Sequence, residues 1–173
     1  MARHHSEMAA QHANDEEEIR RRIETWAAAI RVKDLERVMS IYAPDVVSFD
    51  VEAPLQYAGS EAKRKRWCDT FASYERVLRY EIRDLTIASE GNLAFGRSLN
   101  RLNGILLGGD ESGFWLRWTS CFRKIDGRWL IAHEQISAPI DPKSGTAPRS
   151  QAVRRCGLRP ARRRARIGHL GDE

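Results

Sequence analysis

Two titratable side chains in this sequence lie within apolar runs, the carboxylate of Asp50 and the imidazole of His133. A carboxylate at the end of the predicted strand 46–51 can take a proton from one carbon atom and return it to another. An imidazole on the predicted strand 128–138 can serve as acid, base or ligand donor near neutral pH. Each has an ordinary alternative. Asp50 can point to water from a polar loop, and His133 can be a structural histidine that is hydrogen-bonded to a neighbouring tyrosine or backbone carbonyl.

The strands that carry such groups have further polar and aromatic residues on the same face. Period-two alternation in strand 128–138 places Trp129, His133 and Gln135 together, and in the preceding strand it places Trp118 with Ser120. Aromatic side chains on such a face can hold a flat apolar ligand, but the core of any small domain also needs them. Both interpretations stay open.

The first half of the chain is predicted to be mainly helical. Helical spacing runs from Asn14, where Asn14 or Asp15 can cap the helix, through Ile19, Ile23, Trp26 and Ile30. A second, short helix begins at Asp34 and ends before Pro44, because the residue that precedes a proline avoids the α region. A third helix begins at Ser60.

The second half alternates with period two and predicts four antiparallel strands, at 77–89, 92–105, 113–125 and 128–138. Asp126-Gly127 between two alternating runs is typical of a two-residue hairpin turn, so the last two strands should be neighbours. Helices followed by an antiparallel meander predict an α+β fold in which the helices cover one face of a curved sheet.

The charge is unevenly distributed along the chain. The 173 residues include 29 Lys and Arg and 24 Asp and Glu. Segment 139–173 carries nine basic and three acidic residues, a net charge of +6, which leaves −1 for the rest. We therefore predict a disordered N-terminal tail at 1–13, one domain at 14–138 and a basic disordered tail at 139–173. The basic tail lacks interleaved aromatics, so nucleic-acid binding is not expected.

Several function classes find no support in the motifs. The chain has no glycine-rich dinucleotide or phosphate loop, no HExxH pair and no nucleophile elbow, so we expect no cofactor and no metal site. Its three cysteines, Cys68, Cys121 and Cys156, lack ligand spacing and are interpreted as reduced thiols. With no apolar leader or span, a cytoplasmic location without membrane contact is expected.

Two segments resemble the ketosteroid isomerase-like and SnoaL-like branch of the nuclear transport factor two-like superfamily. The first comprises WAAAIRVKDL at 26–35, IYAPDVVSFD at 41–50 and YAGS at 57–60. The second is WTSCFRKIDGRWLIAHEQISAP at 118–139, which is similar to the closing hairpin of SnoaL-like domains. The resemblance spans roughly residues 16–140.

This resemblance implies a cone-shaped domain whose apolar interior binds a small molecule and whose sheets pair in a homodimer. It implies that Asp50 takes the position of the proton-abstracting carboxylate of the isomerases. Trp26 and Ser120 fall where those enzymes place hydrogen-bond donors to the substrate oxygen. The aromatic residues expected near the mouth of the cone are Tyr42, Tyr57 and Trp67.

Two functions follow as hypotheses. The first is a cofactor-independent enzyme that transfers a proton on a small apolar carbonyl compound, as an isomerase, cyclase, dehydratase or hydrolase, with Asp50 as proton acceptor and His133 as its partner. The second is a non-catalytic module that binds a small ligand or dimerises. Trp26 and Ser120 at the donor positions favour the second.

Overall fold

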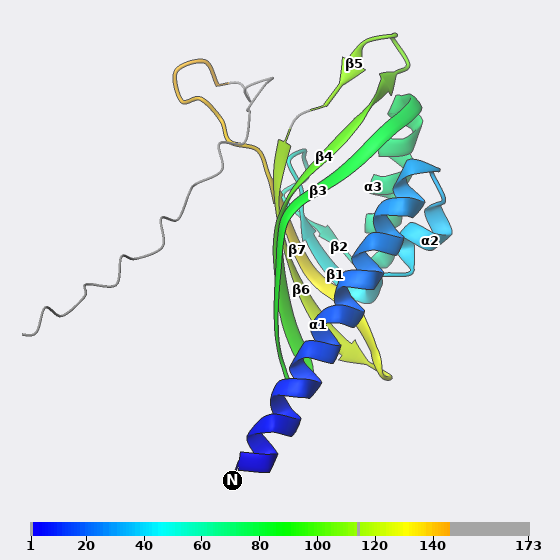
Figure 1. Ribbon diagram of the computed structural model, residues 1–173. Helices are drawn as coiled ribbons and strands as arrows, with labels where there is room; N and C mark the ends of the chain where they lie inside the picture. Colours follow the sequence, from blue (N-terminus) through cyan, green and yellow to red (C-terminus); the bar gives the residue numbers. More distant parts are fainter. Residues whose placement is uncertain (1, 114, 146–173) are drawn as a thin grey trace, which may run out of the picture.

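The computed structural model describes residues 2–113 and 115–145, and residues 2–7 by their backbone alone. The chain begins with three helices and one short strand pair, and continues with long strands (Figure 1). The elements are α1 (Ala2–Arg31), α2 (Leu35–Met39), β1 (Tyr42–Phe49), β2 (Tyr57–Ala58), α3 (Ser60–Ser73), β3 (Tyr74–Glu90), β4 (Leu93–Leu106), β5 (Glu111–Ser112), β6 (Trp115–Ile125) and β7 (Arg128–Ser137). The predicted α+β fold is confirmed.

The strands form one curved sheet in the order β2-β1-β7-β6-β4-β3, with β5 paired to β4. Neighbouring strands are antiparallel except β1 and β7, which run parallel. Figure 1 shows α1, α2 and α3 on one side of this sheet. The helices and the curved sheet therefore enclose the space in which side chains from both layers meet.

The core lies between α1 and the inner face of the sheet. Ile19, Ile23 and Ile30 are fully buried on one stripe of α1, as helical spacing predicts. Trp118 and Phe122 of β6 are buried on the sheet side of the same cluster. Burying each such side chain contributes ~1.5–3 kcal/mol, so this stripe fixes how α1 lies across the sheet.

The start of α1 differs from the prediction, because the helix begins at Ala2 and includes most of the segment predicted to be a disordered tail. Residues 2–13 hold no glycine or proline to interrupt a helix. Asp15 does not cap: its buried carboxylate accepts hydrogen bonds from Lys124 Nζ at 2.7 Å and from Trp129 Nε1 at 3.2 Å. The Asp15 carboxylate, which the sequence pattern made a candidate cap of the helix, therefore bonds residues of the sheet instead.

Other local predictions have mixed outcomes. Asp34 caps α2, where its Oδ1 accepts from the backbone N–H of Arg37 at 3.1 Å. The Asp126-Gly127 turn is confirmed, with φ of 48° and 74°, the left-handed values that such a turn requires. The short helix α2 ends at Met39, before Pro44 as predicted. Pro44 itself lies inside β1, at a break in the pairing with β7 where no ladder donor is needed.

Beyond β7 the structure describes the chain only to residue 145, so most of the predicted basic tail lies outside the described residues. Cys68 and Cys121 are free thiols. Within the described part of the chain, no helix is long and apolar enough to cross a membrane.

Candidate active site

A cavity of about 440 Å³ lies between the inner face of the sheet and the helices α1 and α3. Its wall is mainly apolar and aromatic, and its charged groups come from α3 and from the residues directly after β1. The apolar and aromatic residues are Trp26, Val51, Trp67, Tyr74, Tyr80, Leu102, Leu106, Leu116, Trp118 and Ile136. The polar and charged ones are Asp50, Glu52, Lys63, Arg66, Asp69, Thr70, Ser73, Asn100 and Ser112.

Asp50 follows directly after β1 and places a carboxylate in the cavity wall with only 6% of its side chain exposed. Arg66 of α3 donates to it through Nε at 3.2 Å and through Nη2 at 3.4 Å. The backbone N–H of Val51 donates to Oδ1 at 2.8 Å. These partners fix the orientation of the carboxylate and give both of its oxygens a donor.

A buried ion pair lies beside Asp50. Lys63 Nζ of α3 is 2.5 Å from Glu134 Oε1 of β7, and it is 3.7 Å from Asp50 Oδ2. Glu134 also accepts from Ser48 Oγ at 3.0 Å and from Trp118 Nε1 at 2.8 Å. Because every charged group here has partners, the cost of desolvating the pair is offset.

Hydrogen-bond donors lie elsewhere in the same wall. Ser98 Oγ donates to Asn100 Oδ1 at 2.7 Å, and Asn100 Nδ2 donates to the hydroxyl oxygen of Tyr80 at 3.0 Å. In this series of hydrogen bonds Tyr80 only accepts, and its hydroxyl hydrogen has no acceptor among the described residues. Burial raises the pKa of Tyr80, so the hydroxyl stays protonated and can donate.

Trp26 supplies a second donor. Its indole is buried in the cavity wall, stacked on Trp118 with ring centres 5.2 Å apart. Trp26 Nε1 has no hydrogen-bond partner in the described part of the protein. An unpaired buried N–H is costly, which marks it as a group that an acceptor atom could satisfy.

Comparison with known proteins identifies the family. A model of the SnoaL-like domain matches residues 19–141, which is more than half of the chain. The chain belongs to the SnoaL-like domain family. No curated protein matches it.

Solved structures agree with this SnoaL-like assignment. An NTF2-like protein of unknown function from Pseudomonas putida KT2440 is 32% identical, covers 80% of this chain and 96% of its own, and gives a TM-score of 0.73. A protein with a cystatin-like fold from Nostoc punctiforme is 19% identical, with 72% and 90% covered and a TM-score of 0.60. A proposed dehydratase of the NTF2-like family from Streptomyces avermitilis is 15% identical, with 75% and 99% covered and a TM-score of 0.66.

In this SnoaL-like domain, β7 departs from the alternation predicted for it. Opposite β6, Cys121 pairs with His133 and the next residue, Phe122, pairs with Ile131, so Ala132 is the extra residue of a β-bulge. The bulge reverses which face the following side chains occupy. Glu134 is consequently buried inside, whereas His133 lies on the other face of β7 and contacts Phe49.

The predicted inward orientation of His133 and Gln135 is therefore wrong. His133 is half-buried, with Nδ1 2.8 Å from the backbone oxygen of Val47, and Gln135 is exposed. Neither is among the described residues that line the cavity. The structure thus does not bring His133 and Asp50 to one site.

The other predicted site residues divide into two groups. Trp26, Trp67 and Trp118 line the cavity with Asp50, and Tyr42 lies behind Trp67, whose Nε1 donates to the Tyr42 hydroxyl at 3.2 Å. The remaining three are elsewhere: Ser120 is buried against Gly96, Trp129 contacts Asp15, and Tyr57 donates to the backbone oxygen of Ala53.

Sequence reasoning did not select Lys63, Arg66, Tyr80 or Glu134 for the site. Lys63 carried a signal, because it precedes Trp67 by four residues and therefore shares its helical stripe. No sequence signal pointed to Glu134, since regular alternation assigns it to the outer face of the sheet. Among the described residues, no three side chains of the metal-binding types lie close enough together to hold a metal ion.

Proposed function

We propose that this SnoaL-like domain is a small-molecule enzyme that binds a largely apolar carbonyl compound in the cavity and transfers a proton on it. The observation that carries the proposal is that one mainly apolar cavity is lined by a carboxylate, Asp50, and by two hydrogen-bond donors, Tyr80 and Trp26, that have no acceptor among the described residues. Its volume of about 440 Å³ is ordinary for a small-molecule site.

The roles follow from the chemistry of these groups. Removal of a proton next to a carbonyl places negative charge on the oxygen, and fixed donors aimed at that oxygen stabilise the charge. The Tyr80 hydroxyl and the Trp26 N–H are such donors. Asp50 accepts the proton and returns it to the same or a neighbouring carbon. The aromatic wall excludes water and holds the apolar body of the compound.

Arg66 must loosen its hold on Asp50 for this chemistry to proceed. It has another partner within reach, because its Nη2 also lies 3.3 Å from Glu52 Oε2 at the exposed rim. A shift of Arg66 toward Glu52 would free one oxygen of Asp50 while keeping the guanidinium paired. The cavity thus has the means to expose its base when a ligand enters.

A non-catalytic ligand-binding function is the second candidate, and a specific contact favours it. Arg66 and Lys63 surround the oxygens of Asp50 and compete with a substrate proton for them. An analogy of fold supports the enzyme hypothesis instead, because the proposed dehydratase from Streptomyces avermitilis also has the NTF2-like fold.

The expected homodimer stays a prediction.

An Asp50→Asn variant separates the two functions, because asparagine keeps the shape but cannot accept the proton. The enzyme hypothesis expects loss of hydrogen exchange next to the carbonyl of a flat ketone, with binding of that ketone retained. Exchange that persists in the variant contradicts the assigned role of Asp50.

A further inference from the structure

The cavity has a second polar feature in its wall, a pair of hydroxyl groups from Tyr74 and Ser112. Tyr74 is the first residue of β3 and Ser112 is the last of β5, and both line the cavity. Ser112 Oγ donates a hydrogen bond to the hydroxyl oxygen of Tyr74 at 2.8 Å. Proton transfer at Asp50 makes no use of this pair.

The two hydroxyls share one hydrogen bond and keep one hydrogen between them. Each hydroxyl can donate once. When Ser112 donates to Tyr74, no described residue accepts the hydrogen of the Tyr74 hydroxyl. If Tyr74 donated to Ser112 instead, the hydrogen of Ser112 would be the unused one. In either arrangement the pair offers one O–H to an acceptor atom in the cavity.

The backbone around Tyr74 holds its ring in place. The ring lies against Gly104 of β4, where an added Cβ would be 2.5 Å from Cδ1 of Tyr74, so glycine is required for this close approach. The backbone N–H of Leu107 donates to the backbone oxygen of Ser73 at 3.1 Å. This bond ties the end of β4 to the residue that precedes Tyr74.

Tyr74 lies far along the sheet from Tyr80, the donor proposed for the reacting carbonyl. On β4, Tyr80 pairs with Leu102 and Tyr74 pairs with Leu106. Four residues of a strand span roughly 13 Å. Leu102 and Leu106 both line the cavity, so the wall between the two hydroxyl groups is apolar on this strand.

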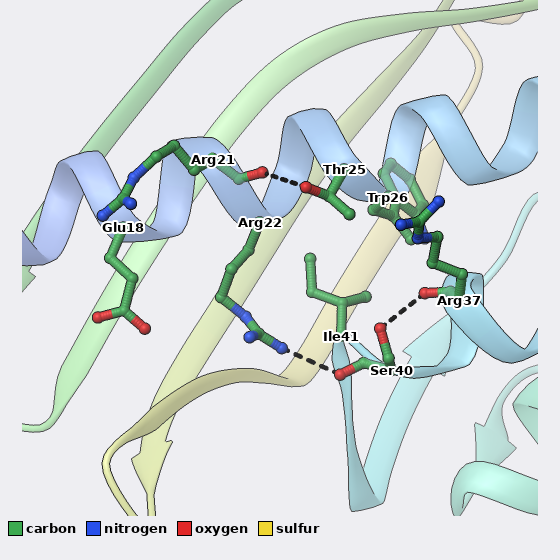
Figure 2. Close-up of a pocket in the computed structure, with 8 residues that line it drawn as sticks. All are labelled: Glu18, Arg21, Arg22, Thr25, Trp26, Arg37, Ser40 and Ile41. Carbon is green, nitrogen blue, oxygen red and sulfur yellow. Dashed lines mark hydrogen bonds between the residues drawn. The ribbon is translucent and has the colours of Figure 1, made fainter.

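Trp26 forms the cavity wall near Tyr80, with the two ring centres 5.4 Å apart. The same indole lines a separate hollow of about 220 Å³ between α1 and the α2–β1 connection (Figure 2). It is 3% exposed and therefore separates the two spaces. A long ligand whose oxygen meets Trp26 and Tyr80 consequently extends along the cavity toward Tyr74.

We propose that Tyr74 and Ser112 form a second recognition site, which binds an oxygen atom at the far end of the ligand. This inference rests on the proposed function, because it takes the reacting carbonyl to lie at Tyr80 and Trp26. The ligand class is then an elongated, largely apolar carbonyl compound with a hydroxyl or carbonyl oxygen remote from the reacting one. A compound without that oxygen leaves the O–H of the pair unused.

Calorimetry with two matched ketones tests the proposal on the full-length protein. The ketones are 4-phenylcyclohexanone and 4-(4-hydroxyphenyl)cyclohexanone, which differ only by a hydroxyl group at the end remote from the carbonyl. We expect the hydroxylated ketone to bind the natural chain about fivefold more tightly, because it gains one hydrogen bond.

A double variant, Tyr74→Phe with Ser112→Ala, locates this preference. It removes both hydroxyls, so the fivefold preference should disappear, whereas the affinity for 4-phenylcyclohexanone should change by less than about twofold. Tyr57→Phe is the matched control and should keep the preference, because Tyr57 lies outside the cavity and its hydroxyl donates to Ala53.

The possible results separate this inference from the function on which it rests. Equal binding of the two ketones to the natural chain, or a preference that persists in the double variant, overturns the second recognition site and leaves the proposed function standing. If neither ketone binds to the natural chain, the proposed function fails and the second recognition site fails with it.

Discussion

Lys63 Nζ and Glu134 Oε1 lie 2.5 Å apart, and their side chains are 2% and 0% exposed. The pair joins α3 to β7 at the cavity wall, and it holds Lys63 within reach of Asp50. One side chain from each layer of the fold thus fixes the charged group beside Asp50.

Loss of this pair should destabilise the protein. Glu134→Gln leaves the charge of Lys63 buried with a weaker partner, so we expect the free energy of unfolding to fall by about 3 kcal/mol. Urea denaturation measures the change. Glu36→Gln removes the exposed partner of Arg64 and serves as the matched control, for which we expect a much smaller loss. Equal losses in the two variants would contradict the structural role of the buried pair.

The Tyr80 hydroxyl should matter for binding. Tyr80→Phe removes a donor to the ligand oxygen, and we expect the affinity for a flat ketone such as β-tetralone to fall about tenfold. Quenching of tryptophan fluorescence can follow the binding. Tyr57→Phe is the control, because Tyr57 lies outside the cavity and its hydroxyl donates to Ala53. An unchanged affinity in the Tyr80 variant would remove it from the site.

His133 should be dispensable for ligand binding and for proton transfer, because the bulge in β7 turns it away from the cavity. His133→Gln is expected to change the affinity for β-tetralone, and any exchange activity, by less than about twofold. Calorimetry and NMR measure the two quantities. A large loss of activity with unchanged folding would restore the sequence-based pairing of His133 with Asp50.

Asp15 should make stability depend on pH. Burial acts to raise its pKa, but hydrogen bonds from Lys124, Gln11 and Trp129 outweigh burial and lower it. Because an unfolded aspartate has a pKa of about 3.9, the stabilising effect is complete above that pH. It is lost as the pH falls through the lower pKa of the folded state.

An Asp15→Asn variant removes this pH-dependent contribution of the Asp15 carboxylate to stability. We expect it to reduce the free energy of unfolding near neutral pH and to make progressively less difference in acid. Urea denaturation over a pH series measures both, with Asp126→Asn in the exposed turn as control. A difference between Asp15→Asn and the natural chain that did not shrink in acid would contradict the assigned contacts.

The fold was predictable because its determinants are periodic and local. The helical stripe of α1, the alternation in β3, β4 and β6 and the Asp126-Gly127 turn are each visible within a few residues. The position of Asp50 in the apolar cavity was also anticipated, through resemblance to a family.

The rest of the site depends on contacts between distant segments. One extra residue, Ala132, reverses the face of β7, and it exchanges His133 for Glu134 inside the protein. No local pattern marks such a bulge. Likewise, the Tyr80 hydroxyl accepts from the Asn100 amide on the neighbouring strand, whose own oxygen already accepts from Ser98, so Asn100 leaves the hydrogen of Tyr80 unused.

Hydrogen exchange tests the central claim most directly. Loss of the proton signals next to the carbonyl of β-tetralone in deuterium oxide is followed by NMR with the natural chain, Asp50→Asn and Asp69→Asn. Asp69 is the matched control, a carboxylate at the cavity with an exposed side chain that pairs with Lys65. We expect the natural chain and Asp69→Asn to accelerate exchange, and Asp50→Asn to be slower by at least about a hundredfold. Equal exchange in all three, or none above the protein-free rate, would contradict proton transfer by Asp50.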